Sequence, residues 1–80
     1  MHERMPVSVE VGRRAGIIHP KAVWLSGHKI GIATQVRQWD RGKLRYYDLQ
    51  SDDGRSILLC LDRRTGQWYQ IDIRGPARPA

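Results

Sequence analysis

Short apolar runs separated by glycine-containing turns constrain the fold of this chain more than any other feature. The segment LLCLDRRTGQWYQIDI, residues 58–73, holds two such runs around one turn. Comparable runs recur at the spacing of about 8–12 residues that is typical of all-β folds. Because no stretch keeps the i, i+3, i+4, i+7 apolar spacing of an amphipathic helix, we expect an all-β chain. The arrangement that fits is a small antiparallel meander of about six strands.

The length of 80 residues sets the domain organisation, since a chain of this size forms one domain around a single small core. We expect residues 5–74 to form that domain. The last six residues, GPARPA, hold two prolines and no anchor. Residues 1–4 and 75–80 are therefore expected to be flexible.

The expected strands follow from alternating or β-rich runs. They are residues 7–11, 19–25, 28–39, 44–50, 56–61 and 67–73. The third is long for a strand, and Gly31 lies where it can bend. Residues 12–16 (GRRAG) and Ser26-Gly27 are expected to be turns.

Turn length decides which face each side chain of the last hairpin occupies. A three-residue loop over residues 64–66, with its glycine last, sets Leu59 opposite Ile71 and Leu61 opposite Tyr69. A loop one residue longer would set Leu59 against Gln70 instead. Because a one-residue slip exchanges the two faces, the apolar match favours the shorter loop.

The two preceding turns extend the same apolar face. A loop over residues 52–54 places Tyr47 opposite Leu59. A two-residue loop at Arg41-Gly42 places Val36 beside Tyr47, although a loop over residues 40–42 is also compatible with the sequence.

These pairings predict one core face and a cover for it. The core face is Thr34, Val36, Tyr47, Leu49, Ile57, Leu59, Leu61, Tyr69, Ile71 and Ile73. The cover is Val7, Val9, Val11, Ala22, Trp24, Ile30 and Ile32. The cover can reach the core only if the sheet folds over itself, so we expect a strongly bent SH3-like or open barrel.

The opposite face carries an unusual share of aromatic residues. Its expected members are Arg37, Trp39, Leu44, Tyr46, Asp48, Leu58, Cys60, Asp62, Trp68, Gln70 and Asp72. An exposed apolar patch rimmed by polar groups marks an interaction site. The alternative is a second small core, with the N-terminal segment or the tail folded across this face.

A net charge of +6 favours a polyanionic partner, such as DNA or RNA. Bases would stack on the aromatic rings while arginines contact phosphates. The candidate site residues are Arg37, Trp39, Arg41, Tyr46, Arg63, Arg64 and Trp68. Asp48, Asp62 and Asp72 on the same face oppose a phosphate backbone, so a protein partner or a homodimer remains the alternative.

The sequence holds no motif that indicates catalysis, a metal or a cofactor. Cys60, His19 and His28 are isolated, and no metal-ligand spacing occurs. We therefore expect a non-catalytic protein without cofactors. A single cysteine, the lack of an apolar leader and the lack of a membrane-length apolar run favour a cytoplasmic location.

The strings VWLSGHKIGI, VRQW, RYYDL and LCLDRRTGQW together resemble a group of small bacterial domains of unknown function. That group has a Trp shortly before a Gly, a later Trp, a Tyr-rich strand and a closing Asp-x-x-x-Gly-x-Trp hairpin. The matching residues, within residues 20–73, are Trp24, Gly27, Trp39, Tyr46, Tyr47, Asp62, Gly66 and Trp68. Two residues separate Trp24 from Gly27, where the group has one. Some members are encoded near DNA-repair polymerases, so the resemblance implies a β fold and a role in nucleic-acid metabolism, with no catalytic residues assigned.

Overall fold

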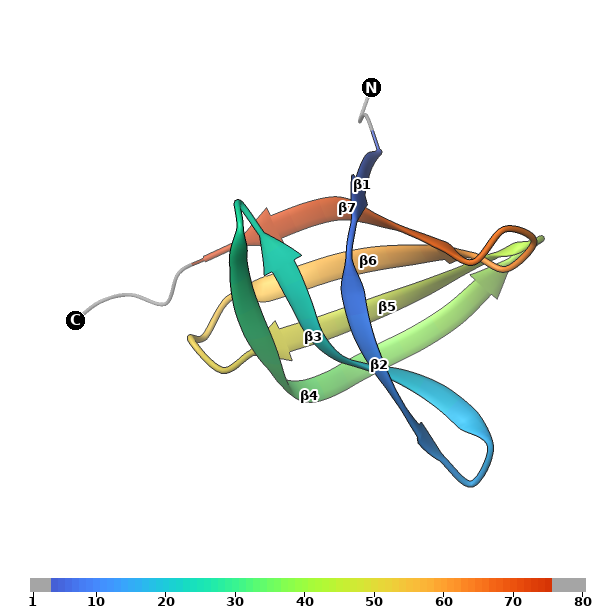
Figure 1. Cartoon of the computed structure of the whole chain (residues 1–80), viewed down its shortest axis with the longest axis horizontal. Coiled ribbons are helices and arrows are strands. Elements are labelled where there is room, and N and C mark those ends of the chain that lie inside the picture. The colour runs from blue at the N-terminus through green and yellow to red at the C-terminus, as the bar shows by residue number, and fades with distance from the viewer. Residues whose placement is uncertain (1–3, 76–80) are drawn as a thin grey trace.

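The computed structural model describes residues 4–75, and strands account for most of them (Figure 1). The strands are β1 (Met5–Val7), β2 (Val9–Arg14), β3 (Ile17–Leu25), β4 (His28–Arg41), β5 (Leu44–Ser51), β6 (Ser56–Asp62) and β7 (Gln67–Arg74). They form one antiparallel sheet in the order β1-β7-β6-β5-β4-β3-β2, and the described residues include no helix. The predicted all-β meander is confirmed, with the first expected strand divided at Ser8. The expected flexible ends fall mainly on residues 1–3 and 76–80, which lie outside the described residues.

The sheet curls because β4 changes partner along its length. This strand of 14 residues pairs with β3 up to Gly31 and with β5 from Ile32 onward. The partners therefore change where the sequence predicts a bend. The result is an open, curled half-barrel (Figure 1), which is the bent open-barrel form expected from the sequence.

At Gly31 the bend in β4 lies close to the β5–β6 turn. The Asp52 backbone N–H donates to the Gly31 carbonyl oxygen at 2.9 Å. A Cβ at position 31 would collide with the Asp52 carboxylate. The bend in β4 and the position of the neighbouring turn are thus coupled.

One short N-terminal segment links the two outer strands of the sheet. β1 pairs with β7, whereas β2 pairs with β3, and only Ser8 separates β1 from β2. The Ser8 carbonyl accepts a hydrogen bond from the Trp24 backbone N–H at 3.0 Å, which continues the β2–β3 ladder. The chain therefore passes from one edge of the sheet to the other without a loop.

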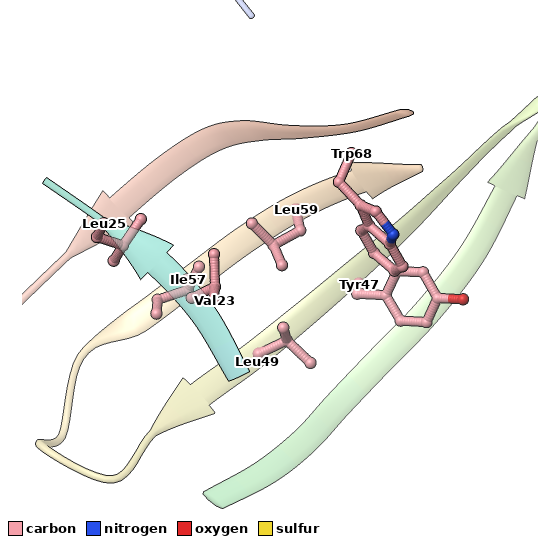
Figure 2. Packing of buried hydrophobic residues seen from close by; sticks show 7 residues of the cluster. All are labelled: Val23, Leu25, Tyr47, Leu49, Ile57, Leu59 and Trp68. Atoms are coloured by element: carbon pink, nitrogen blue, oxygen red, sulfur yellow. The ribbon is translucent and has the colours of Figure 1, made fainter. Parts of the chain in front are cut away.

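A cluster of apolar side chains fills the inside of the curl. Its buried members are Val23, Leu25, Tyr47, Leu49, Ile57, Leu59 and Trp68. Figure 2 shows Val23 and Leu25 of β3 lying over the side chains from β5 and β6. The predicted pairing of Tyr47 with Leu59 and Leu49 with Ile57 is confirmed.

The predicted register of the last hairpin is wrong near its turn. The loop spans four residues, so Asp62 pairs with Gln67 and Leu59 lies opposite Gln70 rather than Ile71. This slip turns Trp68 into the core, where it is 8% exposed. A bulge between Leu58 and Leu59 then restores the predicted pairing of Ile57 with Ile73.

The same slip moves Tyr69 to the other face, because it lies opposite Cys60. Two features of the turn favour the longer loop. The Asp62 carboxylate accepts a hydrogen bond from the Arg64 backbone N–H at 3.0 Å, which starts the turn at Asp62. Gly66 still occupies the last loop position, with a φ of 80°.

The β4–β5 turn also differs from the prediction. It lies at Gly42-Lys43, so Gln38 rather than Val36 is opposite Tyr47. Bulges then shift the register twice along β4. Val36 is 51% exposed and Thr34 is also exposed, so both are removed from the predicted core.

The predicted cover of the core is partly correct. Val7, Val9, Ile30 and Ile32 pack against the cluster, and Ala22 is buried. Trp24 and Val11 are exposed at 39% and 41%, so neither is a buried cover residue. Val23 and Leu25 cover the core in place of Trp24 and Val11, and they lie on the other side of β3 from Trp24.

Candidate nucleic-acid interface

The strand pairings place a row of aromatic residues across the face of the sheet that points away from the core, here called the outer face. Trp39 of β4 lies opposite Tyr46 of β5, Tyr46 opposite Cys60 of β6, and Cys60 opposite Tyr69 of β7. Pro6 of β1 continues the line next to Tyr69. We call Trp39, Tyr46 and Tyr69 the aromatic row.

Trp39 and Tyr46 form one stacked unit within this row. Their ring centroids are 5.4 Å apart and their planes differ by 9°. The Arg37 guanidinium carbon lies 4.6 Å from the centre of the Trp39 ring. Stacking and a cation–π contact both restrict the indole, so it is held in one orientation on the sheet surface.

Tyr69 forms the other end of the row and also carries an arginine. The Arg4 guanidinium carbon lies 5.8 Å from the centre of the Tyr69 ring. Between the two ends, Cys60 is fully buried, and this burial raises the pKa of its thiol. Cys60 therefore fills the space under the row as a small apolar residue.

The structure brings four of the predicted site residues together on the outer face. Arg37, Trp39 and Arg41 alternate along the same side of β4, and Tyr46 lies opposite Trp39. Arg41 is exposed, and it is in no ion pair within residues 4–75. Four of the seven predicted site residues thus share one face of the sheet.

The remaining three predicted site residues lie elsewhere or are neutralised. Trp68 belongs to the core. Arg63 lies toward the inner side, with its guanidinium 3.5 Å from the Asp40 carboxylate. Arg64 pairs with Asp62 at 3.1 Å, and this contact lowers the pKa of Asp62. Tyr69 was missed by the sequence analysis, and the Asp62 turn signal is what could have identified it.

Acidic residues border the aromatic row on both sides. On one side, Asp48 lies opposite Arg37, and Asp72, which is paired with Arg74 at 3.3 Å, lies in the same line across the sheet. On the other side, Asp62 lies in line with Leu44 and Arg41 and is paired with Arg64. Because Asp48 is in no ion pair within residues 4–75, a bound polyanion would be expected on the Arg41 side of the row.

Comparisons with known proteins assign no family to this chain. No family model, curated protein or solved structure matches this chain. Within residues 4–75, no group of three or more His, Cys, Asp or Glu side chains is placed to hold a metal ion. That part of the chain also contains no helix long and apolar enough to cross a membrane.

Proposed function

We propose that this protein is a non-catalytic, single-stranded nucleic-acid-binding module that acts in the cytoplasm. The observation that carries the proposal is the aromatic row of Trp39, Tyr46 and Tyr69, which crosses the outer face with an arginine against the ring at each end. Single-stranded nucleic acids bind to such surfaces because every base has a face that stacks on an aromatic ring. The lone cysteine is consistent with a reducing compartment.

The dimensions of the row suit more than one base. Trp39 and Tyr69 lie on strands separated by three inter-strand steps, or about 14 Å at roughly 4.8 Å per step. RNA-binding sheets of comparable width stack two or three bases on aromatic side chains. Because Tyr46 already stacks on Trp39, a base at this end would stack on the outer side of the pair or displace Arg37.

The arrangement of charge supports the same partner. Arg37 and Arg41 project from the same side of β4, on either side of Trp39 along the strand. Arg4 adds a third guanidinium at the other end of the row. Phosphates of a strand that crosses the sheet along the row can contact these groups without approaching the core.

The test is an anisotropy titration of fluorescein-labelled oligothymidylate and oligouridylate of about 15 nucleotides, together with a duplex of the same length. We expect both single strands to bind more tightly than the duplex. Trp39→Ala should weaken single-strand binding by about 1–3 kcal/mol, or roughly 5- to 150-fold.

Trp24→Ala is the matched control for that variant. Trp24 is also a partly exposed indole with a cation over its ring, in this case Lys29 at 5.5 Å. It belongs to the β3–β4 hairpin and is not part of the aromatic row. Equal losses for Trp24→Ala and Trp39→Ala, or no binding at low salt, would contradict the proposal.

A second candidate function is self-association through an unpaired strand edge. From Ile32 onward β4 pairs only with β5, so its other edge has no strand partner within residues 4–75. This edge and the protruding β2–β3 hairpin border an open cleft of about 660 Å³. The exposed side chain of Val36 adds apolar surface there.

Exposed strand edges pair readily with other strands. If a dimer forms in this way, sedimentation will show it, and Val36→Lys will dissociate it because a charge on the edge opposes pairing. A monomer at all accessible concentrations excludes this second function.

A further inference from the structure

A second cavity opens on the inner side of the curled sheet, away from the aromatic row. It has a volume of about 560 Å³, within the range of small-molecule sites. The β2–β3 hairpin forms one wall through Val11, Ile17 and Ile18. Leu61 and Trp68 form the apolar part of the facing wall.

Two arginines occupy the polar part of this cavity and share a single carboxylate. The Arg45 guanidinium donates to both Asp40 oxygens, at 2.7 and 3.3 Å. Arg63 lies 3.5 Å from the same carboxylate, which is longer than a well-formed hydrogen bond. Two guanidinium groups and one carboxylate leave one net positive charge at the cavity, so the site is suited to one anionic group.

A hydroxyl without a hydrogen-bond partner lies at the same place. Tyr47 lines the cavity and its side chain is fully buried. Its hydroxyl lies near the Arg45 guanidinium but makes no well-formed hydrogen bond within residues 4–75. Figure 2 shows this hydroxyl at the end of the cluster, pointing away from Leu49 and Leu59. A buried hydroxyl in this condition is unfavourable until a ligand supplies an acceptor.

We propose that this cavity binds a small organic molecule with an apolar body and one oxyanion, either a carboxylate or a phosphate. The apolar body lies between Ile17 and Trp68. The oxyanion is held by Arg63 and Arg45, and one of its oxygens accepts a hydrogen bond from the Tyr47 hydroxyl after the Arg45 side chain shifts. This site is on the other side of the sheet from the proposed nucleic-acid interface and does not depend on it.

The test uses three naphthalene probes that differ in one group: 2-naphthoate, 2-naphthyl phosphate and neutral 2-naphthamide. Each is titrated into the uniformly ¹⁵N-labelled full chain and followed by the backbone amide signals and the Trp indole signals. We expect at least one of the anions to shift the Gly66 amide and the Trp68 indole signal and to bind about tenfold more tightly than the amide. The anion that binds more tightly shows whether the site prefers a carboxylate or a phosphate.

Two variants test the assigned contacts. Arg63→Gln should weaken binding of the two anions by about tenfold and leave the affinity for 2-naphthamide unchanged. Tyr47→Phe removes only the unpartnered hydroxyl, so it should leave the fold intact and weaken anion binding by roughly fivefold. Arg74→Gln is the matched control, since it removes a guanidinium that pairs with Asp72 outside the cavity.

Three outcomes overturn the proposal. The first is that neither anion shifts the Gly66 and Trp68 signals at millimolar concentration. The second is equal affinity for the two anions and for 2-naphthamide, which would mean that the cavity binds apolar molecules without recognising an anion. The third is that Arg63→Gln and Arg74→Gln weaken binding equally, which would mean general charge attraction. Failure of oligonucleotides to bind the outer face would leave all three readouts unchanged.

Discussion

Trp68 packs against Tyr47 inside the curl, with ring centroids 5.1 Å apart and planes tilted by 41° (Figure 2). This contact joins β7 to β5 across β6 at one end of the buried cluster. Trp68 therefore has a structural role in the core, whereas Trp39 lies on the outer face.

The first prediction compares these two indoles. Trp68→Ala should lower the free energy of unfolding by about 3–5 kcal/mol, since it removes a large buried ring. Trp39→Ala should lower it by only about 0.5–1.5 kcal/mol, the magnitude of one aromatic pair. Urea denaturation followed by circular dichroism measures both values. The reverse order would mean that the core lies on the side of Trp39.

The second prediction concerns the turn between β3 and β4. Ser26 and Gly27 both have positive φ, 50° and 80°, which is the geometry of a type I′ turn. Asn tolerates this region better than Ser does, so Ser26→Asn should raise the free energy of unfolding by about 0.5–1 kcal/mol. Gly27→Ala should lower it by about 1–2 kcal/mol, because alanine is strained at this positive φ. Thermal denaturation of the two variants shows whether they shift the melting temperature in opposite directions.

The third prediction tests the coupling between the bend in β4 and the β5–β6 turn. Gly31→Ala should be destabilising because the added methyl group collides with the Asp52 carboxylate. The same substitution in an Asp52→Gly background should be milder, with a coupling free energy of about 0.5–3 kcal/mol. Urea denaturation of the four proteins of this cycle gives the coupling. Additive losses would show that the two residues do not interact.

The fourth prediction concerns acid stability at the β5–β6 turn. Hydrogen bonds from Arg55 and from the Ser51 hydroxyl lower the pKa of Asp53 to about 2. An Asp in an unfolded chain has a pKa near 3.9. Because the folded-state pKa is lower, the contribution of Asp53 is fully present above about pH 4 and is lost as the pH falls toward about 2.

Asp53→Asn removes this titration. The free energy of unfolding of that variant should therefore fall less between about pH 5 and pH 2 than that of the wild type. Asp72→Asn controls for the general effect of one removed carboxylate, since Asp72 pairs with Arg74 on β7 and not in this turn. Identical acid profiles for wild type and Asp53→Asn would exclude the turn as a source of acid sensitivity.

The fifth prediction concerns the salt dependence of oligonucleotide binding. Each phosphate contact to a single strand contributes about 0.7 to the slope of log affinity against log salt concentration. Arg41→Gln should reduce that slope by about this amount. Arg13→Gln, at the tip of the β2–β3 hairpin, should leave the slope unchanged because Arg13 is not on the outer face of β4–β7. A slope unaffected by Arg41→Gln would remove this residue from the proposed interface.

The sequence was sufficient for the faces of β5 and of β4 from Arg37 to Arg41, even where it failed for their pairing, but it failed for the bulged part of β4 that contains Thr34 and Val36. The observed turn lies one position later than predicted, which moves each partner by two residues. A shift of two keeps every side chain on its own face, so Trp39 and Tyr46 remain on the outer face as predicted.

The last hairpin shows the opposite case. Its loop is longer than predicted by one residue, and a shift of one exchanges the two faces. Trp68 is therefore in the core and Tyr69 is on the outer face, the reverse of the prediction. The apolar match along the whole hairpin favours the shorter loop, but the observed pairing follows that register only beyond the bulge, where Ile57 lies opposite Ile73. The bulge between Leu58 and Leu59 joins the observed register near the turn to the predicted register beyond it, and no feature of the hydrophobic pattern reveals this bulge.

The N-terminal segment that links the two edges of the sheet sets an order for assembly during synthesis. Met5–Val7 must wait for its partners Trp68–Gln70, which leave the ribosome only after nearly every other strand has been made. Until then the apolar interior lacks one of its walls, and the nascent chain is exposed to aggregation and to chaperones. The pairing of β1 with β7 is therefore expected to be among the last to form.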